Sequence, residues 1–155
     1  MTANFKQIEL DYEARNLSPN RALLDLARRF ARRGGKVMLI SDMYLDAKSI
    51  SGLVREVCGA VPYISRVVSS ADTVVSKASG LLFPEIEHEI GVPGSRILHV
   101  GDSIIGDYRK PRQAGWNAEI FPIAPAEMAR RKMGLRQMEA LLGRHHAVLA
   151  GWLKL

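Results

Sequence analysis

The sequence predicts an α/β fold, a three-layer α/β/α sandwich built around a mainly parallel, Rossmann-like sheet. Short apolar runs, typical of buried parallel strands, occur near residues 37–41, 66–69, 97–101 and 118–121. Stretches with helical periodicity separate these runs, and such alternation places helices on both faces of a sheet. The chain has 155 residues, which is enough for one domain with its own core.

The first 35 residues predict two helices. The first covers residues 5–16 and carries on one face Phe5, Ile8 and Tyr12. The second is expected to begin with Ser18 as its N-cap and Pro19 as its first residue. Its core stripe is Leu23, Leu24, Ala27, Phe30 and Ala31. The arginines between them suit a solvent-exposed helix face better than a phosphate-binding patch.

Polar side chains that suit phosphate chemistry follow three of the predicted strands. Ser41 ends the first, where a hydroxyl can donate a hydrogen bond to a phosphoryl oxygen. Lys77 is expected near the start of a helix, where its charge opposes the helix dipole. Asp102 and Asp107 follow the third strand, and carboxylates at this spacing suit Mg²⁺. A strand-ending serine, a surface lysine and helix-capping acids are the structural alternatives.

The distribution of charge and the single cysteine limit the classes of protein to which this chain could belong. The net charge is +6, and residues 126–155 hold six Lys/Arg against two Glu. We therefore divide the chain into a core, residues 1–125, and a basic helical extension, residues 126–155, broken at Gly134 and Gly143. Cys58 alone cannot form an internal disulfide, which fits a cytoplasmic location. Neither a membrane span nor a secretory signal is expected.

Three stretches resemble sequence motifs of the haloacid dehalogenase-like (HAD) superfamily, most of whose members are Mg²⁺-dependent phosphatases. KVMLIS resembles the second motif, Lys77 the third, and HVGDSIIGD the fourth. ISDMYL, SSADTVVSKASGLLF and ILHVGDSIIGDYRKPRQAGW are similar, more narrowly, to predicted HAD hydrolases found alone or fused to bacterial glycosyltransferases. The resemblance covers about residues 9–122.

The resemblance implies roles for five residues and a substrate class. It implies that Ser41, Lys77 and Asp102 are catalytic and that Ser41, Asp42 and Lys77 bind phosphate. It also implies that Asp102 and Asp107 hold Mg²⁺, and that the substrate is a phosphorylated small molecule.

One motif of the superfamily is absent from this sequence. The first motif, a strand ending in Asp-x-Asp, supplies the nucleophile and the general acid/base, and its strand lies between those ending here at Ser41 and Val100. The nearest candidate, Asp11-Tyr12-Glu13, has a helical pattern, and residues 1–17 resemble the remnant of a cap segment. We therefore expect an N-terminally incomplete, inactive phosphatase with weak Mg²⁺ binding. A homo-oligomer or a partner segment would supply the missing central strand.

Two other interpretations remain open. The chain is alternatively a non-catalytic HAD-like module for binding or regulation. A weaker alternative is a nucleic-acid or acidic-surface binder that uses the basic extension, which offers only Trp152 for stacking on bases.

Overall fold

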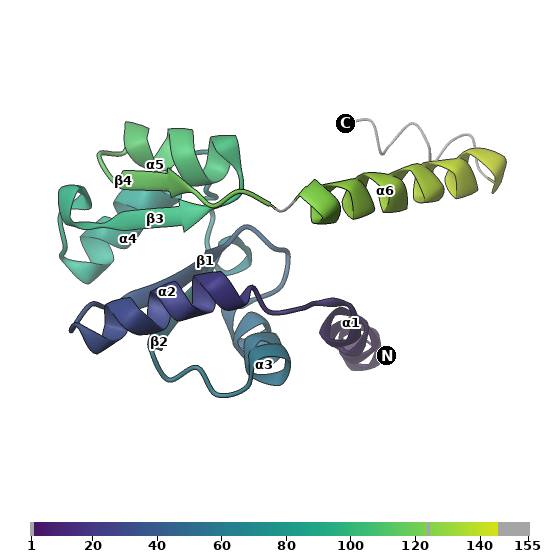
Figure 1. Ribbon diagram of the computed structural model, residues 1–155, viewed down its shortest axis with the longest axis horizontal. Helices are drawn as coiled ribbons and strands as arrows, with labels where there is room; N and C mark the ends of the chain where they lie inside the picture. The colour runs from purple at the N-terminus through teal and green to yellow at the C-terminus, as the bar shows by residue number, and fades with distance from the viewer. Residues whose placement is uncertain (1, 124, 146–155) are drawn as a thin grey trace.

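The computed structural model describes residues 2–123 and 125–145 and has the predicted alternation of helices and strands (Figure 1). The helices are α1 (Thr2–Asn16), α2 (Arg21–Arg32), α3 (Ala47–Cys58), α4 (Leu82–Ile90), α5 (Lys110–Gln113) and α6 (Pro125–His145). The strands are β1 (Val37–Ser41), β2 (Ile64–Ser69), β3 (Leu98–Gly101) and β4 (Asn117–Ile120). Short helical turns are η1 (Ser70–Asp72), η2 (Gly94–Arg96) and η3 (Ile104–Arg109).

The strands form two separate parallel pairs. β1 pairs with β2, with Ser41 opposite Ser69, and β3 pairs with β4, with Gly101 opposite Ile120. No pairing joins β1 to β3 within the part of the chain that the structure describes. The parallel strands are therefore confirmed, but they form two small sheets instead of one. Direct pairing of β1 with β3, one of the ways to close the sheet, does not occur.

Alternating side chains of β1 and β2 pack against helices on opposite faces. On one face, Leu39 and Val67 contact a cluster whose buried members on α3 are Ile50 and Leu53. On the other face, Met38 and Val68 pack with α4. This arrangement follows from the two-residue period of a strand. It gives the β1–β2 pair the predicted helix–sheet–helix layering.

Helix α4 ties the two strand pairs together. Its Leu82, Phe83 and Ile86 are buried in one cluster with Val68 of β2 and with Trp116, which precedes β4. The Phe83 ring meets the Trp116 ring edge-to-face, with 5.1 Å between their centroids. Offset and edge-to-face ring pairs of this kind add to the apolar burial. The main core thus lies under both sheets.

The start of α2 differs from the prediction. Asn20, not Ser18, is the N-cap, because its side chain accepts a hydrogen bond from the Leu23 N–H at 3.1 Å. Pro19 consequently lies before the helix. The predicted core stripe of α2 is at best half-buried, and none of the residues of this helix is fully buried.

The packing face of α1 also differs from the prediction. Phe5, Ile8 and Tyr12 share an exposed face. Leu10 and Ala14 contact the α3 cluster instead. The helical pattern located the helix correctly, but it contained apolar residues on two faces and could not identify the one that packs.

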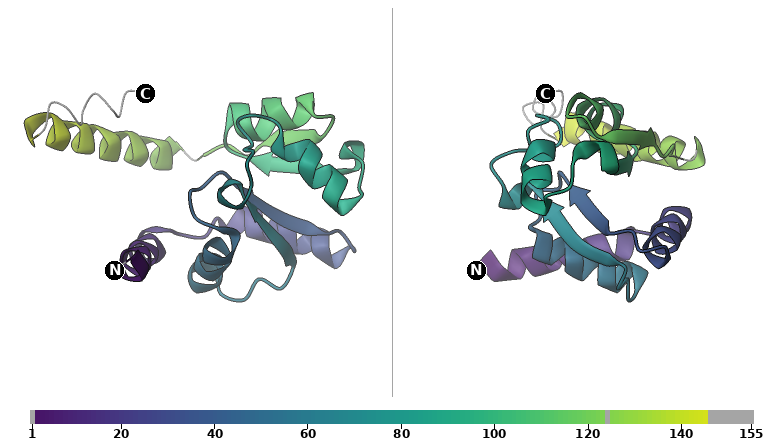
Figure 2. Two further views of the ribbon diagram at one scale, coloured as in Figure 1. Left: turned by 180° about the vertical axis from the view of Figure 1, so that it is seen from behind. Right: turned by 90° about the vertical axis from the view of Figure 1, so that its left-hand side faces the viewer.

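Helix α6 extends away from the strands and their covering helices (Figures 1 and 2). It runs without a break through Gly134 and Gly143, so the predicted breaks are wrong. An interior glycine costs a helix only about 1 kcal/mol relative to alanine, which the surrounding good helix formers offset. Among the described residues, no helix is both long and apolar enough to span a membrane.

The shared core should dominate stability. We expect Phe83→Ala to lower the free energy of unfolding by about 3–5 kcal/mol, since the side chain is fully buried and a cavity would remain. Phe5→Ala is the matched control, because Phe5 is 73% exposed and its removal should cost about 0.5 kcal/mol or less. Urea unfolding of both variants measures the difference. Equal losses would show that α4 is not the common core.

Candidate functional site

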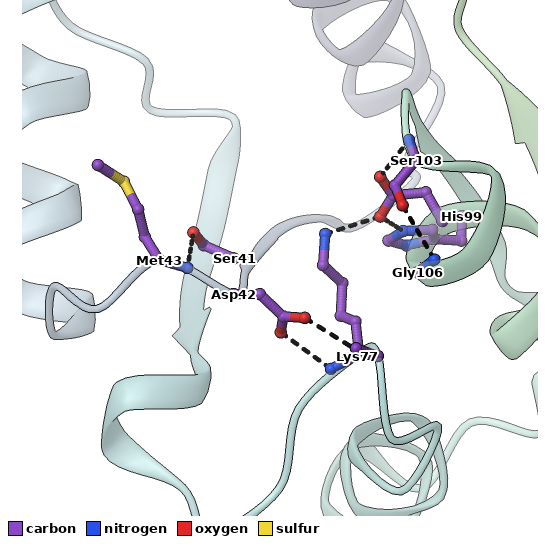
Figure 3. Close-up of polar contacts among 9 residues, drawn as sticks. Ser41, Asp42, Met43, Lys77, His99, Ser103 and Gly106 are labelled. Carbon is purple, nitrogen blue, oxygen red and sulfur yellow. Dashed lines mark hydrogen bonds and ion pairs between the residues drawn. The ribbon is translucent and has the colours of Figure 1, made fainter. Parts of the chain in front are cut away.

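The predicted phosphate-site residues lie on loops that follow β1, β2 and β3. Ser41 is the last residue of β1, and Asp102 follows β3. Lys77 lies in a turn between β2 and α4, and Asp107 lies in η3. Lys77 therefore does not start a helix, and the predicted conflict with a helix dipole is wrong. In Figure 3 the Lys77 side chain extends from beside Asp42 toward His99 and Ser103.

Lys77 connects the carboxyl ends of the two sheets. Its backbone N–H donates to Asp42 Oδ1 at 2.9 Å, next to β1. Its ammonium Nζ lies 2.7 Å from Asp107 Oδ1, next to β3. Asp42 Oδ2 also accepts from the Ala78 N–H at 3.2 Å. Asp42 thus holds the turn that carries Lys77.

Asp107 is a buried carboxylate with three donors around it. It is 3% exposed. His99 Nε2 lies 2.9 Å from Oδ1, and the Ser103 N–H donates to Oδ2 at 3.0 Å. Burial by itself raises the pKa of Asp107, but the hydrogen bonds from His99, Lys77 and Ser103 outweigh it and hold the pKa below its ordinary value. The carboxylate is therefore charged at neutral pH.

A glycine permits this carboxylate to approach β3. A Cβ at Gly101 would lie 2.4 Å from Asp107 Cγ, closer than real contacts allow. Ser103 then caps η3, a π-helical turn, by accepting from the Gly106 N–H at 3.1 Å. Such turns are frequent at functional sites. The Gly101-Asp102-Ser103 sequence thus turns the chain and brings Asp107 back against the strand.

Ser41 is half-buried, and its hydroxyl already accepts one hydrogen bond. The Met43 N–H donates to Ser41 Oγ at 3.1 Å. A hydroxyl has one proton to donate in addition to its lone pairs, so Ser41 can still donate to an anion. Its predicted role in phosphate binding remains a prediction.

The two predicted metal ligands differ in their surroundings. Asp102 is exposed, whereas both oxygens of Asp107 accept hydrogen bonds. Within the described residues, no group of three or more His, Cys, Asp or Glu side chains gathers as a metal site would require. Mg²⁺ commonly keeps several waters and uses one or two protein carboxylates. Asp102 fits such a ligand, and Asp107 fits the anchor of Lys77.

Two residues of this cluster were missed by the sequence reasoning. The sequence pattern predicts His99 as one residue of an apolar strand and Ser103 as one residue of the loop after it. His99 packs edge-to-face on Phe83, with 5.6 Å between ring centroids, while its Nε2 reaches Asp107. The only indication in the sequence was a polar ring inside the apolar run ILHV, since buried polar groups need partners.

The lowered pKa of Asp107 predicts a pH dependence of stability. In an unfolded chain Asp107 would titrate near its ordinary pKa of about 4. Its contribution is therefore complete above that pH and is lost as the pH falls toward the lower pKa of the folded state. Asp107→Asn should cost about 3 kcal/mol at neutral pH, because Lys77 loses its partner, and less in acid. Urea unfolding of both proteins against pH, with Asp25→Asn as control, measures this. A pH-independent cost would contradict it.

Comparisons with known proteins support the predicted resemblance. No protein-family model matches the chain. Over 68 residues the chain is 34% identical to "Haloacid dehalogenase-like hydrolase domain-containing protein 3" of Danio rerio, a match that covers 44% of this chain and 28% of that protein.

A solved Lactobacillus delbrueckii subsp. bulgaricus protein, designated as a phosphoglycolate phosphatase, matches with a TM-score of 0.54 and 20% identity. That match covers 66% of this chain and 41% of the solved one. The chain thus spans less than half of either protein. In sequence it resembles the HAD-like hydrolases, and its fold is the α/β fold found in such a phosphatase.

Proposed function

We propose that the chain is the phosphate-binding portion of a HAD-type, Mg²⁺-dependent phosphatase. The observation that carries the proposal is the position of the Lys77 ammonium. It is held on the charged Asp107 carboxylate, between the ends of β1 and β3, with Ser41 and Asp102 on the adjoining loops. A hydroxyl, a cation and carboxylates at the carboxyl ends of the two strand pairs suit the stabilisation of a phosphoryl group.

Each side chain has a distinct part in this proposal. Ser41 donates a hydrogen bond to a phosphoryl oxygen, and Lys77 offsets the negative charge of the phosphate. Asp102 holds Mg²⁺ together with water and the phosphate, and the metal supplies further charge neutralisation. Asp42 and Asp107 position Lys77 from its two ends. The substrate class is a phosphorylated small molecule.

Turnover requires a nucleophile, and Asp42 and Asp11 are the first carboxylates to consider outside the proposed metal site and the anchor of Lys77. Asp42 accepts hydrogen bonds from the N–H groups of residues 77 and 78. Asp11 lies on α1 and accepts from Gln7 Nε2 at 2.7 Å. We expect residues 1–155 alone to be inactive because the Asp-x-Asp motif is absent from the sequence. A carboxylate nucleophile would divide phosphate hydrolysis into two easier steps through a covalent intermediate.

The missing strand is part of the same proposal. β1 and β3 each have one pairing partner among the described residues, so each keeps an edge without a strand. A second copy of the chain or a segment of another polypeptide would pair with these edges. The nucleophile would come from a polypeptide whose strand ends in Asp-x-Asp, because this sequence lacks that motif. A non-catalytic module that binds phosphorylated ligands is the second candidate, and the same cluster around Lys77 favours it.

Activity assays separate these candidates. We expect the chain to bind phosphate weakly and to hydrolyse a chromogenic phosphomonoester several orders of magnitude more slowly than a complete enzyme, since losing a nucleophile commonly costs that much. Lys77→Ala should abolish phosphate binding. Lys48→Ala, which removes an exposed lysine of α3, should leave it unchanged. Calorimetry measures the binding and absorbance the turnover.

Supplying a segment with Asp-x-Asp should restore Mg²⁺-dependent hydrolysis if the chain is part of a phosphatase. Continued phosphate binding without any restored turnover would favour the binding module. Robust turnover by the chain alone, abolished by Lys77→Ala and by Asp102→Asn, would contradict the proposal and direct attention to Asp42 or Asp11 as nucleophile.

Metal binding should be weak and should depend on Asp102. One exposed carboxylate replaces few of the waters of Mg²⁺, which dehydrates reluctantly. Titration calorimetry of the chain, of Asp102→Asn and of the control Asp25→Asn measures the affinity. Tight binding that survives Asp102→Asn would place the metal site elsewhere.

A further inference from the structure

A cavity of about 260 Å³ lies beside β2. It is separate from the cluster formed by Lys77, His99, Ser103 and Asp107. Its walls are the Arg66–Ser69 segment of β2, residues of α4, and the loop around Asp72. In Figures 1 and 2, β1 lies between β2 and the β3–β4 pair. Ala47 of α3 and Leu82 of α4 both line the cavity, and these helices cover opposite faces of the β1–β2 pair, so the cavity lies at the edge of β2 away from β1. Ser41, Lys77 and Asp102 do not line it.

The outer edge of β2 lacks a neighbouring strand. β2 pairs only with β1 within the described part of the chain. A strand edge presents a row of N–H and C=O groups at regular spacing, which is a template for a further strand. Val67 of β2, which is half-buried, supplies accessible apolar surface beside this edge, whereas Leu82 and Ile86 of α4, which also line the cavity, are fully buried. An extended peptide is the ligand that satisfies both features.

The charges around the cavity are mostly acidic. Asp72, Glu85 and Glu89 line it, against the single Arg66. Glu89 is paired with Arg66, and Asp72 accepts from the Ala47 N–H at 2.7 Å. The exposed Glu85 carboxylate has no hydrogen bond or ion pair with any residue that the structure describes. This acidic surface stands out on a chain whose net charge is +6, and it favours a cationic ligand.

We propose that this groove binds an extended, cationic peptide segment of another protein, which pairs with the outer edge of β2 as an added strand. Main-chain hydrogen bonds to β2 supply the affinity. A lysine or arginine of the peptide pairs with Glu85, and an apolar side chain packs against Val67. The cavity is smaller than the roughly 300–1,000 Å³ of small-molecule sites, and it suits one or two side chains of such a peptide.

A peptide with alternating valine and lysine tests the pairing directly. Alternation places the lysines on one face of the strand and the valines on the other. With the full chain, binding should slow amide exchange in β2 by about tenfold or more, because a strand edge without a partner becomes paired. A peptide with glutamate in place of lysine should neither bind nor slow exchange. Sedimentation of the chain without peptide reports self-association.

Variants of the chain test the ionic contact. Glu85→Lys should weaken binding of the lysine peptide about tenfold or more, and Glu85→Gln should weaken it less. Glu56→Lys makes the same charge change on α3, away from the cavity, and should have little effect. Because Glu85 lies in the first turn of α4, thermal unfolding of each variant verifies that the fold is kept.

Several outcomes would overturn the proposal. Equal weakening by Glu85→Lys and Glu56→Lys would reveal non-specific attraction, and binding without slower exchange in β2 would exclude strand pairing. A dimer of the free chain with β2 already protected would show that a second copy covers this edge. Phosphate binding at Lys77 is measured separately, so failure here leaves the proposed phosphatase site untouched, and the reverse also holds.

Discussion

The ion pair between Lys77 and Asp107 joins the two halves of the molecule at the carboxyl ends of their strands. One end of Lys77 is fixed by its backbone N–H on Asp42, and the other by its ammonium on Asp107. Both partners of the ion pair are largely buried. A buried charge without its partner is costly, so this contact constrains the β2–α4 turn and η3 together. The residues of the candidate site, Lys77 and Asp107, are therefore also the residues that connect the two sheets.

The surroundings of Asp107 explain how such a pair is maintained. Ordinarily, burial favours a neutral carboxyl group. Here His99, Lys77 and the Ser103 N–H supply enough hydrogen bonds to keep it charged. Gly101 provides the space, and the rings of Phe83 and Trp116 form the apolar side of the cluster. The electrostatic site is thus built directly on the main hydrophobic core.

The sequence predicted the strands, and the position of the candidate site residues at or beyond their ends, more reliably than the packing of the helices. The apolar runs that end at Ser41 and at Gly101-Asp102 identify strands and their ends, because strand ends and turns depend mainly on neighbouring residues. The packing face of α1 depends on α3, which is distant in sequence. The sequence pattern therefore could not show that Leu10 packs against the core while Phe5 is exposed. His99 was missed for another reason: its partner Asp107 is only eight residues away, but it reaches His99 through the π-helical turn η3, which the apolar pattern does not reveal. Lys77 does meet Asp107, as its place near a strand end led us to expect, but it lies in a turn and not at the start of a helix.

The order of pairing in the sheets bears on how the chain folds. Each sheet consists of strands consecutive in sequence, β1 with β2 and β3 with β4. The connection that closes each pair is shorter than the chain that links β1 to β4, so pairing within a sheet costs less loop-closure entropy than joining the two sheets. The two halves are consequently able to acquire their secondary structure independently, before α4 and Lys77 bring them together. Assembly of the joint is then the late event, and a destabilised joint would leave two partly structured units with exposed strand edges, a form prone to aggregation.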